Sequence, residues 1–160
     1  MTLPVGSKAP DFVAPALNAE NEQLRLSDYL ADGNVLLAFY PLDFSPVCSV
    51  QIPEFSENVA QFQRTNTRVI AVSVDSMYAH KAWNDKLGGL KIPLVSDLNR
   101  EIASKFGVLR PDGFAERAMY FIEKGGIIKW AFVEETPASK REIREVLGKV
   151  VELTKQTATA

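Results

Sequence analysis

Two apolar segments separated by a long helical stretch constrain the fold of this chain more than any other feature. Residues 35–40 are apolar throughout, and residues 68–74 form a second, nearly apolar run. Strands that are buried on both faces of a sheet have this composition. Residues 46–65 between the two runs predict a helix. A strand, a helix and a strand joined in this way favour parallel pairing of the two strands.

The rest of the chain predicts a mixed sheet. Residues 123–126, Glu-Lys-Gly-Gly, have the composition of a tight turn between two strands, and residues 18–21 indicate a second, smaller hairpin. The other expected elements are strands at 92–95, 118–122 and 127–133 and helices at 28–30, 77–87, 100–106 and from 136 or 139 onward. This order fits best an α/β class with a thioredoxin-like fold, in which helices flank both faces of a mixed central β-sheet.

Capping residues and prolines predict the boundaries of the helices. Ser27 is expected to cap the first short helix, and Gly33 to end it. The last helix is expected to open at Thr136, which precedes a proline, or at Ser139, which begins a capping box. Pro53 lacks the N–H group that an uninterrupted helix would use, so we expect a kink or a bulge there.

The composition excludes several classes of protein. One cysteine among 160 residues excludes an internal disulfide, and with a single histidine no metal site and no cofactor are expected. A net charge of -2 gives no bulk electrostatic reason to bind nucleic acid or anionic lipid. No apolar run approaches the roughly 20 residues that span a membrane, and the first residues lack the pattern of a signal peptide. We therefore expect a cytoplasmic protein with one domain over residues 1–160.

The single cysteine lies where open α/β sheets place their functional sites. Cys48 follows the carboxyl end of the strand at 35–40, and Pro46 suits the first turn of the next helix. Free backbone N–H groups and the helix dipole in that turn favour the thiolate, which is the nucleophilic form. A free cysteine is more often just a small buried apolar residue. Position alone leaves both interpretations open.

The segment around Cys48 resembles the active-site segment of the peroxiredoxins, the alkyl hydroperoxide reductase and thiol-specific antioxidant family. The family pattern is proline, three residues, threonine or serine, two residues and cysteine, and Pro41, Ser45 and Cys48 meet it. The similarity continues through residues 6–12, 71–75, 92–97 and 116–122. With one cysteine, the chain is most similar to the one-cysteine members, the AhpE-like and Q-type (bacterioferritin comigratory protein) groups.

The resemblance implies a thiol-dependent peroxidase that reduces hydrogen peroxide or organic hydroperoxides. Cys48 would be the peroxidatic nucleophile, cycling from thiolate to sulfenic acid. Ser45 would hydrogen-bond the peroxide, Pro41 would shield the sulfur, and Arg117 would complete the site. The backbone N–H groups of Val47 and Cys48 would supply further donors.

Two replacements and the missing second cysteine bear on this resemblance. Ser45 stands where most members have threonine, and Gln51 stands where many have glutamate but can still bind in the site. An external thiol, from thioredoxin, a glutaredoxin-like protein or a small molecule, would have to attack the sulfenic acid. The resemblance also implies a homodimer or a higher homo-oligomer, with Phe44, Tyr78 and Trp83 as contributors to the contact.

A function of another class stays open beside the enzyme. In a redox-sensing or holdase-like interaction module, oxidation of Cys48 would be a signal and not a step of turnover. The remaining aromatic and titratable candidates have weaker signals. Trp83 is expected to pack under the catalytic loop, and His80 is expected to be a surface residue and not a catalytic base.

Overall fold

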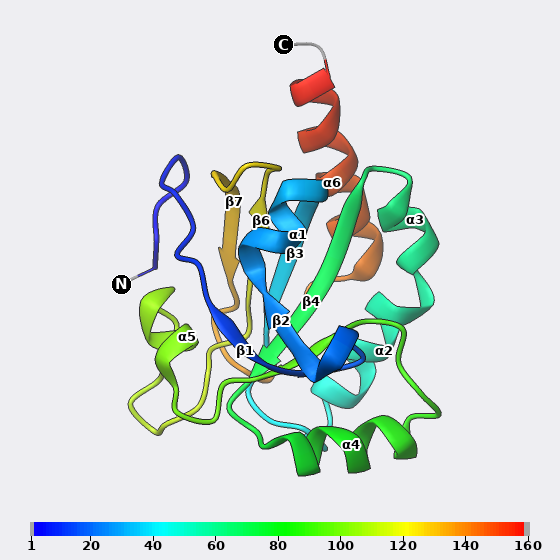
Figure 1. Cartoon of the computed structure of the whole chain (residues 1–160), viewed down its shortest axis with the longest axis vertical. Helices are drawn as coiled ribbons and strands as arrows, with labels where there is room; N and C mark the ends of the chain where they lie inside the picture. Colours follow the sequence, from blue (N-terminus) through cyan, green and yellow to red (C-terminus); the bar gives the residue numbers. More distant parts are fainter. Residues whose placement is uncertain (1, 159–160) are drawn as a thin grey trace.

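The computed structural model describes residues 2–158, and its strands form one seven-stranded sheet (Figure 1). The strands are β1 (Val13–Leu17), β2 (Gln23–Arg25), β3 (Asn34–Phe39), β4 (Thr67–Ser73), β5 (Leu94–Ser96), β6 (Ala118–Ile122) and β7 (Ile128–Val133). Their order across the sheet is β2-β1-β5-β4-β3-β6-β7. The three strands β3, β4 and β5 are parallel, and the other pairings are antiparallel. The predicted strand, helix, strand unit and both hairpins are confirmed.

Helices cover both faces of the sheet (Figure 1). They are the short η1 (Glu20–Glu22), α1 (Leu26–Asp32), α2 (Cys48–Glu57), α3 (Val59–Gln63), α4 (Met77–Lys86), α5 (Glu101–Lys105) and α6 (Ile143–Ala158). Alternate residues of β3 enter two separate cores, with Leu37 in one and Leu36 in the other. The first core includes residues of α1 and α5, and the second includes residues of α2, α3, α4 and α6. The predicted thioredoxin-like fold is therefore confirmed.

The helix expected over residues 46–65 is two helices. Helix α2 continues through Pro53, where a kink or bulge was expected, and the break comes at Asn58, with φ −106° and ψ 16°. The side chain of Asn58 donates to the Glu54 carbonyl at 2.8 Å. Because a short polar side chain can compete with the backbone for such a carbonyl, it ends the helix where the proline does not.

The first helix begins earlier than the sequence predicts. Ser27 lies inside α1, and its N–H and hydroxyl both donate to the Asp11 carboxylate at 2.9 Å. The cap therefore comes from a distant aspartate, and the prediction that Ser27 caps the helix is wrong. Gly33 does follow α1, but in extended geometry; a Cβ there would meet the Asn66 carbonyl oxygen at 2.7 Å.

The last helix begins later than either predicted opening. Helix α6 starts at Ile143, and Thr136 and Ser139 lie in the connection that precedes it. We call this connection, residues 134–142, the strap. The Ser139 N–H donates to the Thr136 carbonyl at 3.1 Å, and the two hydroxyl groups lie 3.2 Å apart. Thr136 and Ser139 thus stabilise a local turn and do not cap a helix. Within residues 2–158, no helix has the length and apolarity needed to cross a membrane.

Candidate active site

Cys48 is the first residue of α2, in the first helical turn after β3 as predicted. Its side chain is fully buried. The next amides are used within the turn: Ser49 N–H donates to the Ser45 carbonyl at 2.9 Å, and Gln51 N–H donates to the Val47 carbonyl at 2.9 Å. The N–H groups of Val47 and Cys48 have no acceptor among the described residues. They are the free donors that a helix start provides.

Arg117 is the residue that the fold brings to the sulfur. It lies just before β6 and is 2% exposed. Its Nη2 donates to Cys48 Sγ at 3.0 Å, and its Nη1 donates to Gln51 Oε1 at 2.5 Å. Its Nε donates to the Pro137 carbonyl at 3.0 Å, from the strap. All three nitrogens are engaged, so the guanidinium plane is fixed relative to α2.

This contact places a fixed positive charge beside the sulfur. An arginine side chain stays charged at any pH that the protein meets, and its planar fork donates in fixed directions. A charge-assisted hydrogen bond is stronger than a neutral one, and burial weakens screening by solvent. The other two acceptors, the Gln51 amide and the Pro137 carbonyl, are neutral. The Glu134 carboxyl also interacts with the Arg117 charge, although burial raises the pKa of that carboxyl. The contact at 3.0 Å places the positive charge of Arg117 beside Cys48, whose thiolate is the nucleophilic form.

Ser45 and Pro41 belong to the loop that leads into α2. The Ser45 hydroxyl donates to the Leu42 carbonyl at 2.9 Å, and Pro41 is buried directly after Tyr40. Within the described residues, neither has a hydrogen bond to the sulfur. Of the residues named from the sequence, the structure thus joins Gln51 and Arg117 directly to the Cys48 cluster and places Ser45 and Pro41 in the adjoining loop.

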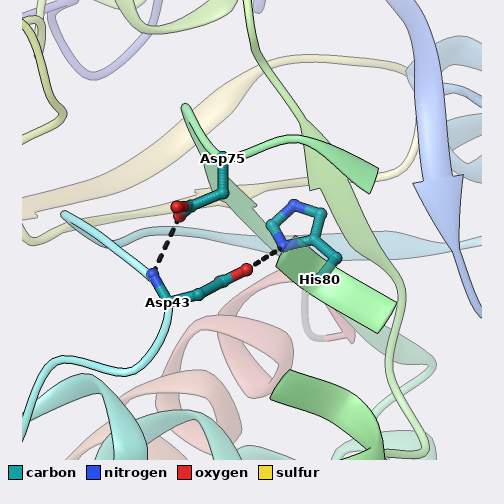
Figure 2. Close-up of side chains that lie close together, drawn as sticks. All are labelled: Asp43, Asp75 and His80. Carbon is teal, nitrogen blue, oxygen red and sulfur yellow. Dashed lines mark hydrogen bonds and ion pairs between the residues drawn. The ribbon is translucent and has the colours of Figure 1, made fainter. Parts of the chain in front are cut away.

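A second buried network, which no sequence pattern predicted, holds the same loop (Figure 2). The Asp43 N–H donates to the Asp75 carboxylate at 2.8 Å, and the Tyr40 hydroxyl donates to Asp43 Oδ1 at 2.6 Å. His80 Nδ1 lies 2.7 Å from Asp43 Oδ2, and His80 Nε2 lies 3.0 Å from the Val95 carbonyl oxygen. These contacts tie the loop to β4, α4 and β5 at once.

His80 is fully buried, so the expectation of a surface residue is wrong. The Val95 carbonyl can only accept, which requires a proton on Nε2. The contact with Asp43 then needs a second proton between Nδ1 and the carboxylate. His80 and Asp43 therefore share one proton in a buried pair that carries no net charge.

The environment of this network sets its protonation. Burial raises the pKa of Asp75, and the hydrogen bonds from the Asp43 N–H and the Ser73 hydroxyl oppose part of that rise. Burial, reinforced by the Asp43 carboxylate, raises the pKa of Tyr40 well above its usual value, so Tyr40 stays a neutral donor. The ligand atoms of Asp43, Asp75 and His80 lie within 4.8 Å of one another. A metal ion there would have to displace the proton that His80 Nδ1 and Asp43 share.

Trp83 packs under the loop, as predicted. It is 1% exposed, its Nε1–H donates to Ser49 Oγ at 3.3 Å, and its ring lies 5.5 Å from the Tyr40 ring. Trp83 is thus enclosed by its own chain, and the expectation that it contributes to a contact between subunits is wrong. Phe44 and Tyr78 are 47% and 89% exposed. Phe44 also has a φ of +69°, a strained value for a bulky residue.

Comparison with known proteins identifies the family. The family model described as "AhpC/TSA family" matches residues 5–131. The chain therefore belongs to the AhpC/TSA family, the peroxiredoxins, which are thiol peroxidases. The fold and a buried cysteine beside an arginine agree with that membership.

Three similar proteins show how far the likeness extends. The chain is 47% identical over 140 residues to the chloroplastic 2-cysteine peroxiredoxin of Chattonella marina var. antiqua. The matched region covers 83% of this chain and 72% of that relative. It is 46% identical over 133 residues to the chloroplastic 2-Cys peroxiredoxin BAS1 of Hordeum vulgare, covering 78% of this chain. It spans only 63% of that barley protein.

The solved structure of reduced Plasmodium vivax 2-Cys peroxiredoxin superposes with a TM-score of 0.87 at 30% identity. The match covers 96% of this chain and 98% of that chain. These relatives are named for two cysteines, whereas the present 160 residues contain one. The similarity establishes the family but does not confirm the expected one-cysteine subgroup.

Proposed function

We propose that this chain reduces hydrogen peroxide or organic hydroperoxides with Cys48 as the peroxidatic cysteine. The observation that carries the proposal is the 3.0 Å contact between Arg117 Nη2 and Cys48 Sγ, in a buried site at the start of α2. The contact pairs the nucleophile with a fixed cation. Residues 1–160 act as one peroxiredoxin domain, without a cofactor or a metal.

The first half of the reaction consumes the peroxide. The Cys48 thiolate attacks one peroxide oxygen in line, the S–O bond forms as the O–O bond breaks, and Cys48 becomes a sulfenic acid. The electron pair leaves on the other oxygen as alkoxide or hydroxide, which takes a proton from water. Arg117 and the N–H groups of Val47 and Cys48 stabilise the negative charge that develops there.

The neighbouring residues orient these groups. Gln51 holds the guanidinium of Arg117 through its side-chain oxygen. The Ser45 hydroxyl donates to the Leu42 carbonyl, so its oxygen is left to accept a hydrogen bond from the peroxide O–H. Pro41, buried and without an N–H group, shields the sulfur from water.

The second half restores the thiol. We assign the chain to the one-cysteine type, close to the AhpE-like and Q-type groups, because its 160 residues offer no resolving cysteine. An external thiol attacks the sulfenic sulfur and releases water, and a second thiol then frees Cys48 from the mixed disulfide. Thioredoxin, a glutaredoxin-like protein or a small thiol would serve. Because Cys48 is fully buried, the first turn of α2 has to open before that attack.

Assembly and location complete the proposal. The exposed rings of Phe44, in the catalytic loop, and of Tyr78, on α4, favour a homodimer or a higher homo-oligomer. We place the protein in the cytoplasm, where thiols are kept reduced. The proposal includes no nucleic-acid or membrane partner.

Sustained turnover tests this function against the redox-sensing alternative. Peroxide consumption over many equivalents per chain, with a panel of candidate reductants and one fixed peroxide, is the expected result. A single stoichiometric burst with every thiol would point instead to a sensor or a holdase. After one equivalent of peroxide without thiol, non-reducing gels should show mainly monomer, and mass spectrometry should find a sulfenic or sulfinic acid. Rapid conversion to a Cys48–Cys48 dimer would contradict the external-thiol mechanism.

A further inference from the structure

The strap begins with one backbone bond, from the Glu134 N–H to the Arg117 carbonyl at 2.9 Å, and side chains hold the rest of it in place. Its backbone bonds within residues 134–142 close only the local turn at Ser139. Two successive cations anchor its far end. Lys140 Nζ lies 2.9 Å from Glu54 Oε1 on α2, and the Arg141 guanidinium stacks 4.4 Å from the centre of the Phe132 ring on β7. The strap therefore bridges the helix that carries Cys48 and the sheet edge next to Arg117.

The pair between Lys140 and Glu54 is sheltered from solvent. Its side chains are 20% and 26% exposed, whereas Arg68 and Asp32, a surface pair, are 42% and 79% exposed. Solvent screens an ion pair less when it is partly buried. Lys140 also lies 3.8 Å from Glu142, inside the strap, but within residues 2–158 only its ion pair with Glu54 connects it to another element.

The position of the strap matters because Arg117 depends on it. The Pro137 carbonyl is one of two neutral acceptors that orient the guanidinium, the other being Gln51 on α2. If the strap moved away from α2, Arg117 Nε would lose its acceptor. The guanidinium would then turn about its remaining bonds, and its charge would no longer be fixed on Cys48 Sγ.

We propose that Glu54 and Lys140 are positioning residues that hold the strap against α2 and so keep Arg117 aimed at Cys48. The inference rests on the proposed function of Cys48 and Arg117. Neither Glu54 nor Lys140 touches the sulfur; each acts through Pro137 and Arg117. The pair also connects the opening of α2 to the strap, because unwinding that reached Glu54 would release Lys140.

The test reads the ionisation of Cys48 without using peroxide. The rate at which iodoacetamide alkylates Cys48 is measured against pH in the parent, in Glu54→Gln and in Lys140→Gln. Because Cys48 is fully buried, each rate is divided by the rate of the same variant at alkaline pH, where every thiol is ionised, which removes any change in the opening of α2. This relative rate at neutral pH should be about two- to fivefold lower in both variants than in the parent, the range expected for one partly sheltered ion pair. A merely structural defect would change the rate at all pH values.

Charge reversal gives the rescue. The double variant Glu54→Lys with Lys140→Glu should return the neutral-pH rate toward that of the parent. Lys149→Gln, which removes a surface pair on α6 with Glu152, serves as the matched control and should leave the profile unchanged. Circular dichroism confirms that each variant is folded.

Two results would overturn the inference. One is that the single variants show the same alkylation rates against pH as the parent. The other is that the charge-reversed double variant is slowed as much as the two single variants together. Peroxide turnover is measured in parallel on the parent. If the parent consumes no peroxide while the alkylation results hold, the proposed function fails and the positioning role stands.

Discussion

Two buried polar clusters hold the loop before Cys48 and the start of the helix that follows it, one around Arg117 and the other around His80. The arginine cluster consists of Cys48, Gln51, Arg117 and the Pro137 carbonyl. The histidine cluster consists of Tyr40, Asp43, Asp75, His80 and the Val95 carbonyl. In the first, the acceptors that fix the guanidinium are neutral, and the Glu134 carboxyl, whose pKa burial raises, also interacts with its charge. In the second, the imidazole and a carboxylate share one proton, so the pair carries no net charge.

This difference gives the arginine cluster a chemical role and the histidine cluster a structural one. The amide and carbonyl acceptors of Arg117 fix its guanidinium without neutralising it, so its charge is left to stabilise the sulfur and the leaving oxygen. The pair of His80 and Asp43 has no net charge, so it contributes geometry and holds the loop at Asp43. A cation near a cysteine is therefore not in itself a catalytic group; its other partners decide what it can do.

Removing the nucleophile should have the largest effect on activity and almost none on the histidine cluster. Cys48→Ser should abolish peroxide consumption, because a serine hydroxyl is not ionised at neutral pH, while the similar volume preserves the fold. Peroxide assays with the best reductant measure the first effect. The chain has one histidine, so its imidazole NMR signals report His80 alone and should stay where they are in the parent. Residual turnover would refute the mechanism.

Breaking the histidine cluster should mainly reduce stability. His80→Ala leaves the Asp43 carboxylate buried without its partner, which should lower the free energy of unfolding by about 3–5 kcal/mol. Urea denaturation with circular dichroism measures this loss. The folded variant should retain the reactivity of Cys48 better than a variant at Arg117 does.

A double-mutant cycle sharpens that prediction. Asp43→Asn removes the charge that His80 balances, so Asp43→Asn with His80→Ala should cost less than the sum of the two single changes. Strict additivity would mean that the two side chains do not interact as a pair, and the contrast between the clusters would fail.

Removing the cation of the arginine cluster should mainly reduce rate. Arg117→Ala deletes a donor to the developing charge, and loss of one such donor slows a reaction by about 10²-fold or more. The deficit should persist at alkaline pH, where the thiol is ionised without help, and stopped-flow measurement of the first oxidation would show it. Arg110→Ala, a control at an arginine paired with Asp112 and Glu116, should react like the parent. A deficit that vanishes at alkaline pH would confine Arg117 to ionising the thiol.

The sequence could predict the elements that carry their own pattern. The apolar runs predicted β3, β4 and β6 to within a residue or two, and the position of Cys48 after β3 predicted its place at the start of α2. Arg117 and Gln51 were named because the family resemblance assigned roles to their positions. Their contact with one another and with the sulfur required the fold, since α2 and β6 are far apart in the chain.

The errors have a common cause in tertiary contacts. His80 lies in a polar stretch whose sequence suggests solvent, but it shares the inner face of α4 with Trp83. The capping residues of the strap suggest a helix, but Arg117 and Glu54 bind Pro137 and Lys140 and draw the segment across the site. No local pattern encodes these distant partners.

The smallest expected effect is a pH dependence of stability from the edge of the histidine cluster. The pKa of Asp75 is raised from 3.8, so just above that pH the folded state keeps a proton that the unfolded state releases. The stability that this group contributes therefore falls as the pH rises through that window. Asp75→Asn should remove this part of the slope in denaturation experiments between acid and neutral pH. An unchanged slope would contradict the prediction.

The indole of Trp83 gives the molecule an optical signal of its own. Trp83 is enclosed and bonded to Ser49 in the first turn of α2, whereas the other tryptophan, Trp130, lies half-buried on β7. In a Trp130→Phe variant, all indole emission would come from beside the catalytic helix. Unwinding of that turn would break the hydrogen bond between the indole and Ser49 and expose the indole to water, which shifts its emission to longer wavelength. Fluorescence would then follow each opening of the site in real time, without a label.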